Sequence, residues 1–295
     1  MTTSVVIVNW NAGPLLAECV AAVTAQLRPG DEVVLVDNGS TDDSGAAVVA
    51  RHPAVRVIET GANLGFAAGA NRGADAAGGD VLLFLNPDAR PAREALALLV
   101  DTLALVPGAG IAGGGLVDDA GRWQPAAARF GPVAHLLLDT TPGRLPARWR
   151  RRPHAVDWVY GTFVAVRRDL FRQLGGFDVR FFLYGEDMDL CHRAARVGAR
   201  TILVPAARAI HHGAVSAIAR FGGGRDAEVV KSELRFYALR TTPGAVRAFR
   251  TVGALKFGAK ALGAALLGRR EALARNAAIV RACLGFRPEW TPPAA

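Results

Sequence analysis

The sequence is poor in cysteine and has no long uncharged apolar run. Its 295 residues include only three cysteines, Cys19, Cys191 and Cys283, which are far apart and form no CxxC pair. This spacing favours neither a disulfide framework nor a zinc site, and a reducing cytoplasm fits it best. No uncharged apolar run reaches the roughly 20 residues needed to span a bilayer. The N-terminus lacks a basic leader, so we expect it to form a strand and not a signal peptide.

Charge is unevenly distributed along the chain. The formal net charge is +9, and residues 231–295 account for all of it, with twelve Lys and Arg against three Glu. A neutral body with a basic tail indicates that the tail contacts an anionic surface, either phospholipid or nucleic acid. The tail has only scattered aromatic residues and no known nucleic-acid-binding module, so we expect no nucleic-acid partner.

Hydrophobic residues make up 51% of the chain, enough for a substantial core. Apolar strand-like runs alternate with helix-like segments over the first 90 residues, which favours a parallel sheet covered by helices on both faces. The strand-like runs are residues 4–8, 32–36, 55–58 and 81–85. The helix-like segments are residues 15–27, 44–51 and 67–77, followed by 93–106 and 169–174. Residues 118–153 are irregular, and residues 157–168 are again strand-like.

One glycine motif is a false signal. Residues 108–113 match G-x-G-x-x-G, but the dinucleotide-binding motif needs a strand before it and a helix after it. Here the motif follows a helix-like segment and leads into a strand-like one. We interpret its glycines as loop residues.

Polar side chains follow each of the first four strand-like runs. Because the carboxyl ends of parallel strands lie along one edge of a sheet, these residues should meet in one crevice, where open α/β folds bind ligands. Any one of them alone is as well explained as a turn or helix-capping residue. The residues are Asn9, Asp37 with Asn38, Asn63, and Asn86 with Asp88.

A second acidic cluster lies at residues 184–198. Glu186, Asp187 and Asp189 fall in the expected first turn of a helix, where the helix dipole stabilises negative charge. Helical spacing puts Asp187 on the apolar face, and a carboxylate there suits a general base. His211 follows a later strand-like run and is a candidate metal ligand.

Six motifs occur in an order and spacing that resemble family 2 glycosyltransferases with a GT-A fold, in particular the bacterial rhamnosyltransferase-like branch. The resemblance covers about half of the chain. The motifs are VVIVNWN, EVVLVDNGSTDDS, NLGFAAGANRG, LLFLNPDA, the run from GTFVAVRR to HRAARVG, and IHHGAVS.

The resemblance implies roles for individual residues. Asp37 would contact the nucleotide base beside Asn9, and Gly65 and Asn71 would belong to the nucleotide wall. Asp88 would hold Mg²⁺ or Mn²⁺ on the donor diphosphate, while Asn86 replaces the first carboxylate of the usual Asp-x-Asp motif. His211 would help to hold the metal or the diphosphate. Asp187 would be the catalytic base, and the acceptor side is assigned to Asp157, Trp158 and Glu186.

The same resemblance implies an inverting enzyme that moves one L-rhamnose from dTDP-rhamnose to a polyprenyl-diphosphate-linked or other cell-envelope glycan. A Q-x-x-R-W motif after residue 187 would indicate processive synthesis and is missing. Three alternatives remain open: a UDP-sugar donor, a non-catalytic sugar-nucleotide or glycan binder at the membrane, and a nucleotidyltransferase. The last is disfavoured because no G-x-G-T-R motif follows the first strand-like run.

We expect a glycosyltransferase domain over residues 1–235, with a nucleotide half at 1–90 and an acceptor half at 110–235. Residues 236–295 would form a basic helical extension. Its apolar residues Leu255, Ala259, Leu262 and Leu266 recur at helical spacing. They would either lie on an anionic membrane or pack against the domain. The protein would be cytoplasmic, with peripheral attachment to the plasma membrane if the tail binds lipid.

Overall fold

The fold is described from a computed structural model, over residues 1–131, 152–213 and 222–286. A mixed sheet with strand order β3-β2-β1-β4-β11-β6-β12-β5 forms its centre. The first four strands run parallel, as the sequence predicts: β1 (Thr3–Asn9), β2 (Glu32–Asp37), β3 (Arg56–Glu59) and β4 (Val81–Leu85). Their carboxyl ends therefore share one edge.

The second half of the sheet is mixed. β11 (Phe163–Arg167) runs antiparallel between β4 and β6 (Ala109–Val117), and β12 (Arg200–His211) runs parallel to β6. Residues 157–168 do not form one strand, because β10 (Trp158–Val159) leaves the main sheet to pair with β8 (Ala127–Ala128). The short strands β5 (Ala89–Pro91) and β9 (His154–Val156) both pair with β12, and β7 (Trp123–Gln124) pairs with β6.

The glycines of residues 108–113 are only partly loop residues. Gly108 precedes β6 with a φ of +74°, as a loop glycine would, but Gly110 and Gly113 lie inside the strand. A Cβ on Gly113 would sit 2.5 Å from the Cβ of Val159. These strand positions are glycine because neighbouring side chains occupy the space, so the loop interpretation is wrong for them.

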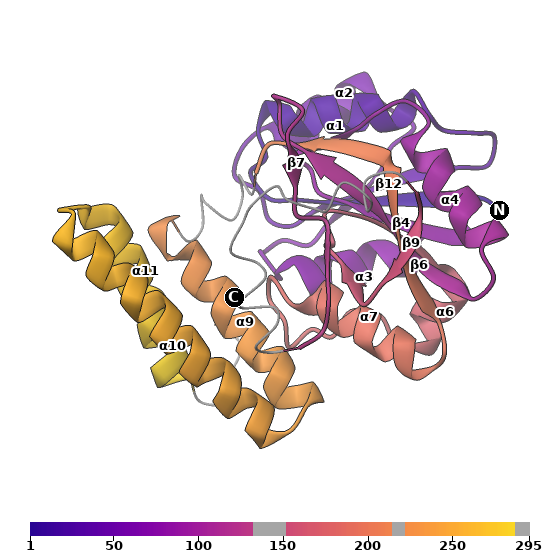
Figure 1. Ribbon diagram of the computed structural model, residues 1–295. Coiled ribbons are helices and arrows are strands. Elements are labelled where there is room, and N and C mark those ends of the chain that lie inside the picture. Colours follow the sequence, from indigo (N-terminus) through magenta and orange to yellow (C-terminus); the bar gives the residue numbers. More distant parts are fainter. Residues whose placement is uncertain (132–151, 214–221, 287–295) are drawn as a thin grey trace.

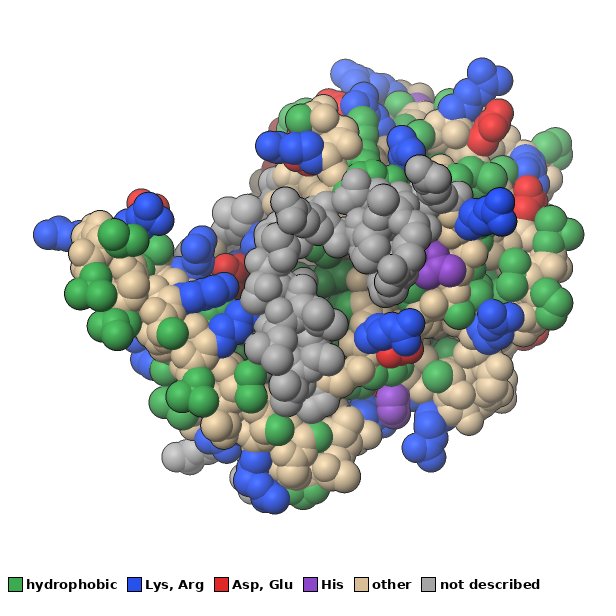
Figure 2. Space-filling model, viewed as in Figure 1, with side chains coloured by type: hydrophobic (Ala, Val, Ile, Leu, Met, Phe, Trp, Pro, Cys, Tyr) green, Lys and Arg blue, Asp and Glu red, His purple; other side chains and the backbone are tan. Residues whose placement is uncertain are grey.

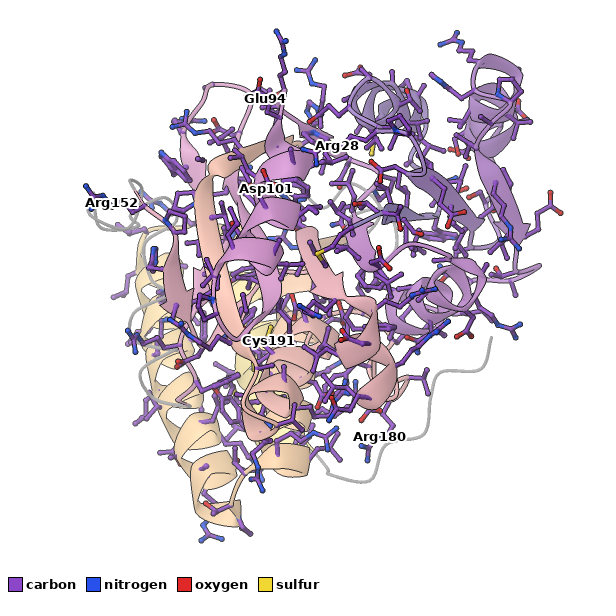
Figure 3. All side chains as sticks on the ribbon, turned by 90° about the vertical axis from the view of Figure 1, so that its right-hand side faces the viewer. Arg28, Glu94, Asp101, Arg152, Arg180 and Cys191 are labelled. Atoms are coloured by element: carbon purple, nitrogen blue, oxygen red, sulfur yellow. The ribbon has the colours of Figure 1, made fainter. Side chains whose placement is uncertain are left out.

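Helices cover both faces of the sheet. In Figure 1, α1 (Pro14–Thr24) and α2 (Ser44–Arg51) lie above it, and α3 (Phe66–Ala76), α6 (Arg168–Gln173) and α7 (Glu186–Arg196) lie below. α4 (Ala95–Leu105) packs on β6 and β12. Cys191 of α7 is buried in the interior, whereas Glu94 and Arg180 point outward at the rim (Figure 3). All three cysteines are free and buried.

Three C-terminal helices form a separate layer beside this body (Figure 1). They are α9 (Arg225–Arg240), which follows a short 3-10 turn at Gly222–Gly224, α10 (Pro243–Leu266) and α11 (Arg270–Gly285). The expected boundary between residues 235 and 236 falls inside α9. Among the described residues, no helix is both long enough and apolar enough to cross a membrane.

Candidate active site

A cleft of about 670 Å³ opens at the carboxyl ends of the first strands. Four of the polar residues predicted to meet there line it: Asn38, Asn63, Asn86 and Asp88. Its size is in the usual range for a site that encloses a small molecule. The crevice inferred from the strand ends is therefore present.

Asn9 and Asp37 lie beside this cleft and not in its described lining. The β1–β2 register pairs them directly. Asn9 is fully buried, and its amide donates hydrogen bonds to the hydroxyls of Ser40 and Ser44 at 3.1 and 2.8 Å. Asp37 accepts a hydrogen bond of 2.8 Å from the Ser40 N–H. This network fixes the loop after β2, which shapes one end of the cleft.

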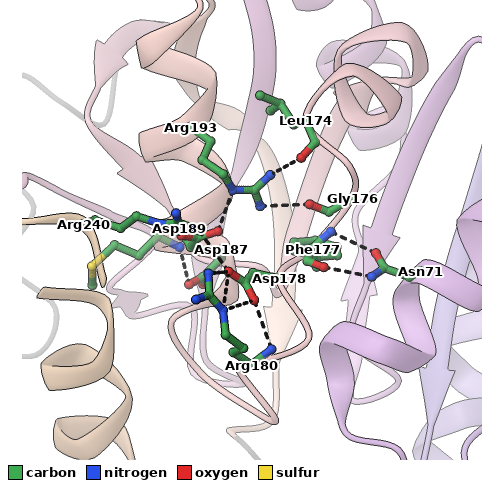
Figure 4. Close-up of polar contacts among 11 residues, drawn as sticks. Asn71, Leu174, Gly176, Phe177, Asp178, Arg180, Asp187, Asp189, Arg193 and Arg240 are labelled. Carbon is green, nitrogen blue, oxygen red and sulfur yellow. Dashed lines mark hydrogen bonds and ion pairs between the residues drawn. The ribbon is translucent and has the colours of Figure 1, made fainter. Parts of the chain in front are cut away.

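Gly65 lines the cleft, whereas Asn71 does not. Gly65 has a φ of +84°, and a Cβ on it would lie 2.4 Å from the carbonyl oxygen of Phe182, so only glycine fits there. The Asn71 amide donates to the Phe177 carbonyl at 2.8 Å and accepts from the Phe177 N–H at 2.9 Å (Figure 4). Asn71 thus joins the nucleotide half to the segment before α7.

Strand pairing brings Asp88 and His211 together. β5 begins directly after Asp88, and its register against β12 pairs Ala89 with His211. The His212 N–H also donates to the Asp88 carbonyl oxygen at 3.1 Å. As a result, Nε2 of His211 lies 3.6 Å from Oδ1 of Asp88, and both side chains are largely buried.

The arrangement around His211 determines which of its ring nitrogens carries the proton. Nε2 of Gln124 donates to the His211 carbonyl oxygen at 2.8 Å, which turns the Gln124 Oε1 toward Nδ1 of His211, also at 2.8 Å. An amide oxygen only accepts, so Nδ1 carries the proton and Nε2 presents a lone pair. Burial lowers the pKa of His211, although the charge of Asp88 opposes this, and the neutral ring is favoured.

Two electron-pair donors, Nε2 of His211 and the Asp88 carboxylate, therefore face each other. Within the described chain, Nε2 is buried and has no hydrogen-bond partner. A divalent cation that takes nitrogen and oxygen ligands fits this pair. No group of three or more His, Cys, Asp or Glu that could hold a metal occurs among the described residues, so the pair alone does not complete a coordination shell.

Asp187 lies next to the cleft, at the start of α7. Its Oδ2 accepts a hydrogen bond of 2.8 Å from the Gly161 N–H, and its Oδ1 accepts one of 2.7 Å from the Met188 N–H. Tyr160 and Thr162, on either side of Gly161, line the cleft. Burial raises the pKa of Asp187 to about 6, against the lowering effect of those hydrogen bonds, and the charge of Glu233 adds to the rise.

Glu186 is more deeply buried than Asp187, with 5% of its surface exposed. Its Oε2 has no hydrogen-bond partner in the part of the chain described. Burial first, and then the neighbouring charge of Asp187, raise the pKa of Glu186 well above its usual range. Burial is thus the main cause of the raised pKa of both carboxyl groups.

Asp157 and Trp158 have packing roles in the structure. Oδ2 of Asp157 accepts a hydrogen bond of 2.8 Å from the Phe130 N–H. Trp158 is buried, and its ring lies 4.7 Å from the ring of Tyr160. Neither residue is in the described lining of the cleft, but Tyr160 is. Trp158 therefore supports Tyr160 from outside the cleft, and Asp157 holds the backbone at Phe130.

The third acid of α7, Asp189, is fully buried. It forms ion pairs with Arg193 at 2.7 Å and with Arg240 of α9, which also binds Asp178 (Figure 4). Arg193 in turn donates to two carbonyl oxygens of the loop after α6. The expectation that Asp187 is the inward-facing acid of this helix is incomplete, since Asp189 and Glu186 are more buried. Asp189 anchors α7 to α9.

Several lining residues have no clear signal in the sequence. Gln124 and Arg225 come from segments outside the recognised motifs and reach the cleft through β7 and the start of α9. Tyr184 also lines the cleft and lies inside a recognised motif that suggested no role for it; it has a φ of +70° and a buried hydroxyl with no hydrogen-bond partner among the described residues. A positive φ is rare for a bulky side chain and marks strain at functional sites. In the sequence, the Tyr-Gly pair directly before the acidic cluster is the feature that could have indicated this strained turn.

The sheet, the cleft and the facing donors together define a nucleotide-sugar transferase fold of the GT-A type. Residues 4–175 match the family model described as glycosyl transferase family 2. The chain belongs to this family. It is 32% identical over 237 residues to an N-acetylglucosaminyl-diphospho-decaprenol L-rhamnosyltransferase of Mycobacterium tuberculosis, covering 72% of this chain and 76% of that protein. It is also 32% identical over 143 residues to the rhamnosyltransferase WbbL of Escherichia coli K12, covering 45% and 52% of the two chains.

Solved structures support the fold. The mannosyltransferase PcManGT from Pyrobaculum calidifontis, in complex with GDP-Man and Mn²⁺, aligns with a TM-score of 0.60 at 21% identity, over 96% of this chain and 86% of that one. GalNAc-T7 with UDP, GalNAc and Mn²⁺ aligns with a TM-score of 0.59 at 20% identity, over 81% and 50% of the two chains. The predicted GT-A fold is confirmed.

Proposed function

We propose that this glycosyltransferase transfers one L-rhamnose, with inversion, from dTDP-rhamnose to an acceptor sugar linked to a polyprenyl diphosphate. The observation that carries the acceptor and the sugar is the 32% identity to the mycobacterial rhamnosyltransferase over three quarters of that protein. The donor nucleotide rests on the resemblance of the motifs to rhamnosyltransferases. The reaction would take place at the cytoplasmic side of a membrane.

The donor would lie in the cleft with its diphosphate toward Asp88 and His211. A divalent cation held by these two residues, such as Mg²⁺ or Mn²⁺, would offset the negative charge of the departing nucleoside diphosphate. Asn86, next to them in the lining, can hydrogen-bond a sugar or phosphate oxygen but adds no charge. The nucleotide would extend toward Gly65 and toward the end of the cleft near Asn9 and Asp37, where Asp37 would bind the nucleobase.

Asp187 would remove the proton of the acceptor hydroxyl. Its pKa of about 6 leaves it ionised at neutral pH yet more basic than an ordinary aspartate. The acceptor would approach past Tyr160, on the side backed by Asp157 and Trp158, so that its hydroxyl meets the carboxylate opposite the departing diphosphate.

Transfer of radiolabelled rhamnose from dTDP-rhamnose to a polyprenyl-diphosphate-linked N-acetylglucosamine tests this function. We expect transfer to need Mg²⁺ or Mn²⁺. Asp187→Asn should lower kcat by about a thousandfold, because the general base is lost, and should leave the Kd for dTDP unchanged by calorimetry. Asp169→Asn, which removes an exposed carboxylate far from the cleft, is the matched control and should keep full activity.

Other results would change the assignment in defined ways. Preference for a UDP-sugar would refute dTDP-rhamnose as donor but keep the mechanism. Tight nucleotide binding without turnover of any nucleotide sugar would favour a non-catalytic binder, which the single carboxylate at the Asn86–Asp88 position makes a real alternative. Loss of both dTDP binding and transfer in Asp187→Asn would make this residue structural.

A further inference from the structure

A second cavity, a groove of about 700 Å³, lies between α9, α10 and α11. It is not part of the donor cleft, and the catalytic scheme leaves it unused. Its apolar wall includes Val230, Phe257, Leu267 and Ile279. Apolar side chains on three helices therefore line a space large enough for several isoprene units or a small ligand.

Basic side chains form the other wall of this groove. Five are basic and only two are acidic. The ammonium groups of Lys256 and Lys260 both lie over the ring of Phe257, at 5.1 and 5.2 Å from its centroid. Figure 2 shows Lys and Arg side chains along the side of the C-terminal helices that faces the α/β body, with hydrophobic side chains on the outer side. The basic residues are Arg225, Lys256, Lys260, Arg269 and Arg275, and the acidic ones are Asp226 and Glu233.

The groove adjoins the donor cleft. Arg225, Asp226 and Val229, in the first two turns of α9, line both cavities. Glu233, one turn further along α9, lines the groove and is close enough to Asp187 for its charge to raise the pKa of that carboxyl. A ligand in the groove would therefore end close to both the sugar donor and Asp187, the proposed general base.

We propose that this groove binds the polyprenyl diphosphate of the acceptor, with the diphosphate on the basic wall and the first isoprene units on the apolar wall. The inference rests on the proposed function and assigns a site to its acceptor. A prenyl diphosphate carries a compact multiple negative charge directly on an apolar chain, and the groove offers the complement of both. The sugar beyond the diphosphate would then point into the region that the two cavities share.

Filling the groove from one wall tests the proposal. A Cβ built on Gly263, which lines the groove in α10, has nothing within 4 Å among the described residues. Gly263→Leu should therefore occupy the groove without a clash, and leucine favours a helix over glycine. Gly258→Leu is the matched control, because Gly258 also lies in α10 with the same open surroundings but does not line the groove.

Binding is measured by calorimetry with farnesyl diphosphate as the probe and the full chain saturated with dTDP in EDTA, so that the donor cleft is occupied. We expect Gly263→Leu to weaken binding about tenfold or more and Gly258→Leu to leave it unchanged. Lys260→Ala with Arg269→Ala should weaken it similarly. Arg247→Ala with Arg281→Ala, two basic residues of the same helices outside the groove, should not.

The competing outcomes separate this inference from the proposed function. If both double variants of basic residues weakened farnesyl diphosphate binding equally, the attraction would come from net charge alone and the proposed site would be refuted. Equal affinity for inorganic diphosphate and farnesyl diphosphate would overturn the apolar half of the proposal. Normal dTDP binding and rhamnose transfer in Gly263→Leu would refute the acceptor site in the groove but not the proposed function. Farnesyl diphosphate binding without transfer of any sugar would refute the proposed function but not the binding site.

Discussion

At Asp187, burial and hydrogen bonding act on the pKa in opposite directions. Desolvation disfavours the charged carboxylate, whereas the N–H groups of Gly161 and Met188 stabilise it, and burial has the larger effect. The result suits a general base, whose pKa should lie near but below the working pH. The same two hydrogen bonds hold the carboxylate in one orientation.

The pKa of Asp187 predicts the acidic limb of the pH profile. A raised pKa means that protonation begins at a higher pH than for an ordinary aspartate, so activity is lost as the pH falls through about 6. We expect kcat/KM for rhamnose transfer to fall about tenfold per pH unit below that value. The control is the Kd for dTDP-rhamnose without acceptor over the same range, which should stay constant because its diphosphate has no terminal phosphate to titrate there. A parallel loss of dTDP-rhamnose binding would assign the pKa to the donor site or to the fold.

Helix α7 carries three acids in three environments. Asp187 is held by backbone N–H groups beside the cleft, Glu186 is buried with a raised pKa, and Asp189 is buried and ion-paired. The ion pairs of Asp189 with Arg193 and Arg240 hold the helix between the α/β body and α9 (Figure 4). The position of Asp187, the proposed general base, thus depends on the ion pairs of Asp189.

Asp189→Asn should destabilise the protein strongly. The change keeps the shape of the side chain but leaves the Arg193 guanidinium without its counter-charge and Arg240 paired only with Asp178. Breaking a buried pair in this way costs about 3 kcal/mol. Urea unfolding measures the loss. Asp169→Asn, whose carboxylate is exposed and paired with Arg167, should cost less than about 1 kcal/mol. Equal losses would show that the buried network adds nothing.

On the scale of the whole molecule, the outer face of α10 is open. Leu255, Leu262 and Leu266 are 69%, 63% and 80% exposed. The alternative that this stripe packs against the catalytic body is therefore wrong for these residues. Exposed leucines on one side of a basic helical layer are typical of surfaces that lie on anionic membranes, and we propose that contact for this stripe.

Flotation with anionic phospholipid vesicles tests the membrane contact. Leu255→Gln with Leu266→Gln should abolish most binding, because the apolar stripe can no longer enter the interface. Leu105→Gln with Val179→Gln changes two equally exposed apolar residues of the α/β body and should leave binding intact. High salt should weaken the wild type, since the basic residues act through screened charges. Undiminished binding of the first variant at low salt would contradict the proposal.

The nucleotide half follows from local sequence patterns, and the rest depends on long-range pairing. The first four strands and the crevice at their ends can be predicted because each strand's polarity and its terminal polar residues are local. The approach of His211 to Asp88 requires the pairing of β5 with β12, segments about 120 residues apart, and no local pattern encodes it. The family resemblance predicted that His211 and Asp88 act together, whereas local sequence patterns alone could not.

The faces of α7 show the same limit. Asp189 and Arg193 lie four residues apart in this helix and form an ion pair. Which face becomes buried, however, depends on α9, which covers Asp189 and contributes Arg240. The groove between the C-terminal helices could not be predicted either, because its basic and apolar walls come from three helices whose packing the sequence does not reveal.

The bridge from Asn71 to Phe177 joins the two halves of the body through a side chain on one side and only backbone atoms on the other. Every residue type except proline offers the same N–H and carbonyl at position 177, so selection can act on position 71 without leaving a trace at its partner. Correlated substitutions between relatives would therefore miss this contact, even though it holds α3 in register with the segment that leads to α7.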